Sequence, residues 1–251
     1  MSTTDTASRR RLLLALATCA AMALVATGCQ DRAEQAREQA AAKRAADNVA
    51  ADQAATAFDD AIAKENWALA KAQGDVLLAQ YPGTPAAVRI RAQHAEAKVR
   101  TEVSREAMRL AALWAYNVES VTGGQQLSAA IYSRDRVDTD GGGARPVRLI
   151  FRDHPTWGRS SYLVLEAGDF DCYGRCRVQV KIDDKSATSM AANRPKTDEA
   201  IAMFIDDQRA LWRMTRGARL MRIEFPVTAG GRRTAVFEVG GLERGRLQSW
   251  N

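Results

Sequence analysis

The stretch Cys-Arg-Val-Gln-Val-Lys-Ile-Asp at residues 176–183 alternates apolar and polar side chains more cleanly than any other part of the chain. In a β-strand, successive side chains point to opposite faces, so its apolar residues share one face and its polar residues the other. The pattern predicts a half-buried antiparallel strand. Asp-Asp-Lys-Ser at residues 183–186 predicts a turn into a partner strand at residues 187–191.

Short runs of the same kind occur on both sides of this strand. They lie at residues 114–118, 127–132, 147–152, 161–165, 221–227 and 235–239, bounded by Gly, Pro, Asp or Ser. One helix is expected among them at residues 197–216, with Thr197 as its N-cap and an apolar stripe that packs on the sheet. We therefore predict that residues 114–251 form an antiparallel sheet or sandwich of about seven to nine strands carrying one helix.

The preceding residues favour helices, which makes the predicted fold class α+β. Residues 29–56 are rich in Ala, Gln, Arg and Glu and nearly free of large apolar side chains, which predicts a solvated helical tether. Residues 57–113 carry apolar side chains at helical spacing and predict a helical hairpin or bundle.

Within that region, residues 57–87 resemble a tetratricopeptide unit, through the connection Tyr-Pro-Gly-Thr-Pro-Ala-Ala at residues 81–87. The resemblance implies two packed antiparallel helices. No second copy follows at the expected period of about 34 residues. A protein-binding groove and plain helix packing both remain open interpretations.

Val-Ala-Thr-Gly-Cys-Gln at residues 25–30 follows an apolar segment, residues 12–26, and the basic run at residues 9–11. This order resembles the lipobox signal of bacterial lipoproteins. The resemblance implies that residues 1–28 are a signal peptide, and that Cys29 becomes the first residue and carries diacylglyceryl and palmitate-type acyl chains.

Such a lipid would anchor the chain in a membrane. Gln30 stands where aspartate would resemble the inner-membrane retention signal, so the expected location is the periplasmic face of the outer membrane. The pair Arg9-Arg10 also leaves twin-arginine export open beside the general secretory route.

Cysteine and charge are consistent with this compartment. Of four cysteines, only Cys172 and Cys176 would remain besides Cys29 after processing, and an even, closely spaced pair in an exported chain predicts a disulfide. Without residues 1–28, the chain has 33 basic and 29 acidic residues. This mild excess suits anionic envelope partners such as lipid headgroups, lipopolysaccharide or peptidoglycan carboxylates, and nucleic acid is not an expected partner.

Two features are candidate binding sites. Arg209, Arg213 and Arg216 are four and three residues apart, so on a helix they line one face, where their forks could hold carboxylate or phosphate. The alternative is an ordinary solvated face. Tyr173 lies at the tip of the loop between the two cysteines, where a stapled hairpin would present an aromatic ring.

Other patterns give weaker indications of chemistry. His154 lies in a turn without a nucleophile motif, and the Asp138–Asp140 loop lacks the carboxylate spacing of an EF-hand. Asp169 and Asp171 could point the same way, as in a glycosidase. We therefore predict no catalytic residue, metal or cofactor.

The expected function is a non-enzymatic binding or scaffold lipoprotein with an envelope protein as partner. An inhibitor or immunity lipoprotein against an envelope-targeting toxin, and a peptidoglycan hydrolase using Asp169 and Asp171, are the alternatives.

Overall fold

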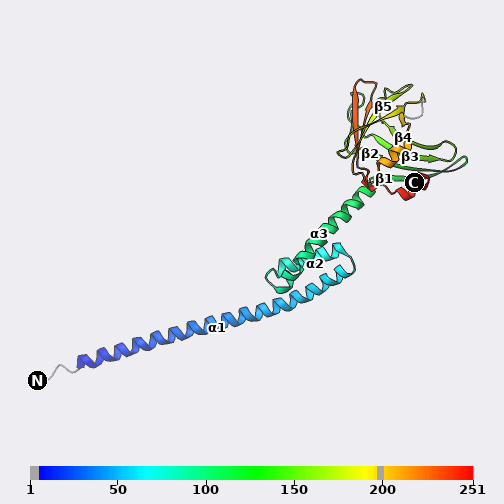
Figure 1. The fold of residues 1–251 in the computed structure, drawn as a ribbon. Coiled ribbons are helices and arrows are strands. Elements are labelled where there is room, and N and C mark those ends of the chain that lie inside the picture. The colour runs from blue at the N-terminus through cyan, green and yellow to red at the C-terminus, as the bar shows by residue number, and fades with distance from the viewer. Residues whose placement is uncertain (1–5, 197–200, 251) are drawn as a thin grey trace. The chain divides into compact units, whose positions relative to one another are not determined.

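The computed structural model describes residues 6–196 and 201–250, with side chains from residue 31 onward. The chain divides into two compact units, Met1–Glu102 and Val103–Asn251. Helices build the first unit and a β-sheet dominates the second, which confirms the predicted α+β class (Figure 1).

The first unit contains α1 (Thr6–Ala63), α2 (Trp67–Gln80) and most of α3 (Pro85–Ala112). Apolar side chains from all three helices form its core, including Ala55 and Phe58 on α1 and Leu77 on α2. Asn66 caps α2 by accepting a hydrogen bond from the Leu69 amide at 3.2 Å. The tether predicted at residues 29–56 is part of α1, which continues unbroken into the core.

In the described part of the second unit, nine antiparallel strands form one sheet in the order β1-β2-β3-β4-β7-β6-β5-β8-β9. Their bounds are β1 (Trp114–Val121), β2 (Gly124–Tyr132), β3 (Arg148–His154), β4 (Gly158–Val164), β5 (Cys176–Ile182), β6 (Thr188–Asn193), β7 (Ala202–Ile205), β8 (Met221–Pro226) and β9 (Arg232–Phe237). The alternation predicted for β5 is confirmed, since Val178 and Val180 are buried and Arg177 is exposed.

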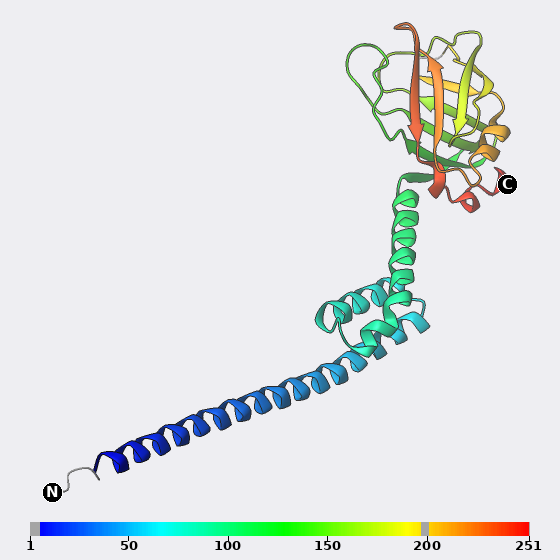
Figure 2. The same ribbon diagram turned by 60° about the vertical axis from the view of Figure 1, so that its left-hand side comes forward.

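The sheet curls so that its first and last strands enclose one core (Figure 2). Phe151 of β3 and Phe237 of β9 belong to the same buried cluster. The amide of Arg134, just after β2, donates to the carbonyl of Val236 on β9 at 2.7 Å, which links the chain after the second strand of the sheet to the last strand. A single two-faced sheet can therefore bury one face without a second layer.

The helix predicted at residues 197–216 is wrong in its extent. Residues 197–200, which include the expected N-cap Thr197, lie outside the described residues. Residues 202–205 form β7, and the helix α4 covers only Gln208–Met214, with Asp207 as its N-cap at 2.9 Å from the Ala210 amide. The apolar spacing misled because β7 is a central strand, with Met203 buried on one face and Phe204 against Tyr162 on the other.

Within the part of the chain that the structure describes, no helix combines the length and apolar character needed to cross a membrane.

Candidate functional site

Five arginines gather around one hollow on the surface of the second unit. Its volume is about 300 Å³. We call it the arginine hollow, and its lining residues are Arg159, Arg209, Arg213, Arg216, Arg244 and Trp250. The structure thus brings the three arginines predicted from spacing together, and it adds two that the spacing did not indicate.

Helix α4 sets the direction of Arg209 and Arg213, whereas Arg216, predicted on the same helix face, lies past the end of the helix at Met214. Its opposite face buries Leu211 and Trp212, and the Trp212 ring lies 5.1 Å from those of Phe151 and Trp250. This aromatic cluster fixes the rotation of the short helix. The exposed face then carries Arg209 and Arg213.

Arg244 and Arg159 are oriented by contacts with the backbone. The Arg244 guanidinium lies 4.2 Å from the Trp212 ring centroid and donates to the Trp212 carbonyl at 3.0 Å and the Thr215 hydroxyl at 2.8 Å. Partial burial, together with the neighbouring charge of Arg216, lowers the pKa of Arg244. Arg159 donates to the carbonyl of Ser249. A bound anion would offset the repulsion between these like charges.

Most other arginines with resolved partners face acids. Arg109 binds Glu238 at 2.7 Å and Arg194 binds Asp169 at 2.9 Å. Among the described residues, no ion pair joins a carboxylate to Arg159, Arg209, Arg213 or Arg216. These four arginines therefore concentrate positive charge on one surface without a carboxylate at ion-pair distance in the described chain.

A second, shallower depression shares Arg159 and Arg209 with the hollow. It has a volume of about 640 Å³, and we call it the indole groove. Its lining residues are Asp153, His154, Pro155, Trp157, Gly158, Arg159, Gln208, Arg209 and Ser249. Because two side chains line both depressions, the two form one continuous polar surface.

Trp157 is the large aromatic residue of the indole groove and is 71% exposed. Its ring stacks on the buried His154 ring at 3.9 Å between centroids, with 16° between the planes. The His154 Nδ1 accepts from the backbone amides of Thr156 and Trp157 at 3.1 and 3.2 Å. His154 therefore fixes the orientation of an exposed indole. Sequence reasoning missed Trp157, although a tryptophan beside the turn glycine Gly158 was a usable signal.

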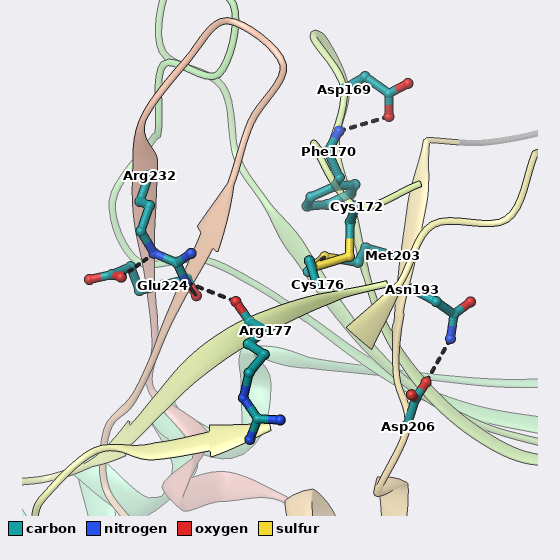
Figure 3. Close-up of a disulfide and its surroundings, with 10 residues drawn as sticks. All are labelled: Asp169, Phe170, Cys172, Cys176, Arg177, Asn193, Met203, Asp206, Glu224 and Arg232. Carbon is teal, nitrogen blue, oxygen red and sulfur yellow. Dashed lines mark hydrogen bonds and ion pairs between the residues drawn. A yellow bond between two sulfur atoms is a disulfide. The ribbon is translucent and has the colours of Figure 1, made fainter. Parts of the chain in front are cut away.

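The predicted disulfide between Cys172 and Cys176 is confirmed. Cys172 is buried, and the Cys176 Sγ lies 3.8 Å from the Sδ of Met203 on β7 (Figure 3). The Tyr173 hydroxyl donates to Asp169 at 2.6 Å, and Arg194 lies 5.5 Å from its ring centroid. Tyr173 is thus held against the domain by its neighbours.

The two carboxylates predicted to lie together, those of Asp169 and Asp171, have different surroundings. Asp169 accepts hydrogen bonds from the Phe170 amide at 2.7 Å and from Arg194 at 2.9 Å, whereas Asp171 is exposed. Burial alone would raise the pKa of Asp169, but the bonds from Tyr173, Arg194 and Phe170 outweigh it and hold the pKa below its ordinary value. A glycosidase acid needs the opposite shift.

In the loop at residues 138–140, the acidic side chains accept hydrogen bonds from nearby backbone amides. Asp138 accepts from the Gly141 amide at 2.7 Å and Asp140 accepts from the Gly142 amide at 2.8 Å, as in turns. In the described ranges, no group of three or more His, Cys, Asp or Glu side chains could hold a metal ion. The side chain of Cys29, the predicted lipidation site, lies outside the described residues.

No protein-family model, curated protein or solved structure matches this chain.

Proposed function

We propose that this chain is a lipid-anchored, non-enzymatic binding protein of the bacterial envelope, and that its β-rich unit docks an anionic partner at the arginine hollow. The observation that carries the proposal is the convergence of five arginines on one hollow. Arginine presents a fixed fork of donors that matches carboxylate and phosphate oxygens in two contacts. Grouping such charges is unfavourable unless an anion joins them.

The lipobox-like sequence at residues 25–30 supports the anchor. Each buried acyl methylene contributes about 0.8 kcal/mol, so several chains on Cys29 would make attachment to the outer membrane, on its periplasmic face, long-lived. Replacing Cys29 with serine should move the protein from the membrane fraction to the soluble fraction and abolish labelling by radioactive palmitate. Unchanged membrane fractionation and labelling would refute the anchor.

Anion docking is tested with residues 29–251 carrying Cys29→Ser and with tripolyphosphate as the probe. We expect Arg209→Gln with Arg213→Gln to weaken binding about tenfold to thirtyfold, since each lost charge-assisted contact at an exposed site is worth about 1 kcal/mol. Calorimetry at low and moderate salt measures the effect.

The matched control is Arg136→Gln with Arg145→Gln, which removes the same charge from exposed side chains that do not line the hollow. It should change the affinity less than twofold. Equal losses in the two double variants would mean that net charge alone attracts the probe, and the docking site would then be rejected.

A further inference from the structure

The arginine hollow and the indole groove continue into one another through Arg159 and Arg209. A ligand that fills both must therefore offer two kinds of chemistry, an anion at one end and a group that suits an aromatic face at the other. We propose, on the basis of the anion docking proposed above, that the ligand is an anionic saccharide. One sugar ring stacks on Trp157 and its charged substituent lies in the arginine hollow.

Trp157 has the properties of a stacking platform. A large apolar side chain at 71% exposure loses the free energy of burial, and its stacking on His154 holds it in place while most of the side chain stays exposed. Arg152 lies 5.5 Å from the Trp157 ring centroid and adds a further constraint. The C–H face of a pyranose is electropositive and complements the negative face of the indole. A platform that is already rigid loses little entropy on binding.

The rim of the groove suits hydroxyl groups. Asp153, which accepts a hydrogen bond from the Ser249 hydroxyl, and the amide of Gln208 both line it and supply acceptors and donors. Asp153 also discriminates between ligand classes. Its carboxylate would repel the second acid of an acidic peptide, but it can accept a hydrogen bond from a sugar hydroxyl.

Sugar phosphates and sugar carboxylates share this chemistry, and both occur on envelope glycans. The test therefore compares glucose 6-phosphate, glucuronate, glucose, inorganic phosphate and a tetraglutamate peptide as probes of residues 29–251 carrying Cys29→Ser. Ligand-observed NMR suits the weak affinity expected of single sugar units. We expect one or both anionic sugars to bind at least fivefold more tightly than inorganic phosphate, glucose or the peptide. The tighter of the two anionic sugars identifies the source of the charge.

The decisive variant is Trp157→Ala. It should weaken binding of the preferred anionic sugar about tenfold and change binding of inorganic phosphate less than twofold. Arg213→Gln should weaken both. Trp157→Phe keeps an aromatic face and should restore most of the affinity. Because the indole is exposed, the melting temperatures of these variants should agree with that of the parent.

The outcomes separate the two proposals. Anion binding that depends on Arg213 but is indifferent to Trp157 would overturn the saccharide inference and leave anion docking intact. Tighter binding of tetraglutamate than of either sugar would also overturn it. If no anion binds, or if Arg213→Gln has no effect on any probe, the docking function itself fails.

Discussion

Replacing Asp169 with asparagine removes one charge from the network that holds the disulfide hairpin against the sheet. The carboxylate accepts hydrogen bonds from Arg194, Tyr173 and the Phe170 amide at 2.9, 2.6 and 2.7 Å. The Arg194 amide in turn donates to the Cys172 carbonyl at 2.9 Å. Asparagine has nearly the same shape but offers one acceptor oxygen in place of two, so the substitution tests the charge rather than the packing.

The magnitude follows from burial. The Arg194 side chain is 5% exposed and that of Asp169 is 27% exposed. Removing one member of a buried ion pair typically costs about 3–5 kcal/mol, because the remaining charge is left in the interior. Solvent reaches Asp169, so we expect a smaller loss of about 2–3 kcal/mol. For a chain of this size that corresponds to a fall in Tm of roughly 5–10 °C.

The effect should depend on pH. The pKa of Asp169 in the folded chain lies below its ordinary value of 3.8, so the folded state binds fewer protons near that pH than the unfolded state does. The stabilisation is therefore complete above about pH 4 and is lost as the pH falls through the lowered pKa. The difference between parent and Asp169→Asn should be full at pH 7 and should shrink below pH 3.8.

Urea unfolding followed by tryptophan fluorescence, at pH 7 and at pH 3, measures both effects. Asp171→Asn is the control, since it removes the same charge two residues away from an exposed side chain and should change stability by no more than about 0.5 kcal/mol. The reasoning is refuted if the two asparagine variants have the same stability at pH 7, or if the Asp169→Asn deficit grows on acidification.

Two further predictions concern the stability of the two units, one prediction for each unit. Gly74→Ala should lower the stability of the helical unit by about 1–2 kcal/mol in thermal circular dichroism, because the new Cβ would lie 2.4 Å from the His94 ring and overpacking outweighs the gain in helix propensity. Gly83→Ala is the control and should be near neutral, because no atom lies within 4 Å of its new Cβ. Equal effects of the two substitutions would contradict this prediction. Cys172→Ala with Cys176→Ala opens a five-residue loop and should lower the free energy of unfolding in urea by about 2 kcal/mol. A reductant should destabilise the parent but not the double variant. An unchanged urea midpoint would show that the disulfide contributes nothing to stability.

The sheet was predictable where local pattern and burial agree. In β5, alternate residues face the core and solvent, so periodicity alone identifies the strand. In β7, apolar residues occupy both faces because neighbouring strands and side chains cover it, and four residues are too few for a period to be read. The error at residues 197–216 is therefore a consequence of tertiary burial, which overrides local propensity.

The site was predictable only in part for a related reason. Arg209 and Arg213 are one turn apart on a helix, so their common face follows from spacing. Arg159 and Arg244 come from a strand and from a turn after the last strand, and only the order of the sheet brings them to α4. No local sequence pattern indicates that such distant segments lie close together in the fold.

The register of β4 and β7 explains why the arginines meet where they do. Ser161 pairs with Ile205, so in an antiparallel ladder Arg159 falls opposite the residue two beyond the end of β7, which is the helix cap Asp207. The first turn of α4, with Arg209, therefore begins beside Arg159. Backbone hydrogen bonds of the sheet hold these like charges together against their repulsion. A cationic site that is assembled before any ligand arrives needs no reorganisation when an anion binds, and this is the physical reason for proposing that an anion docks at this end of the sheet.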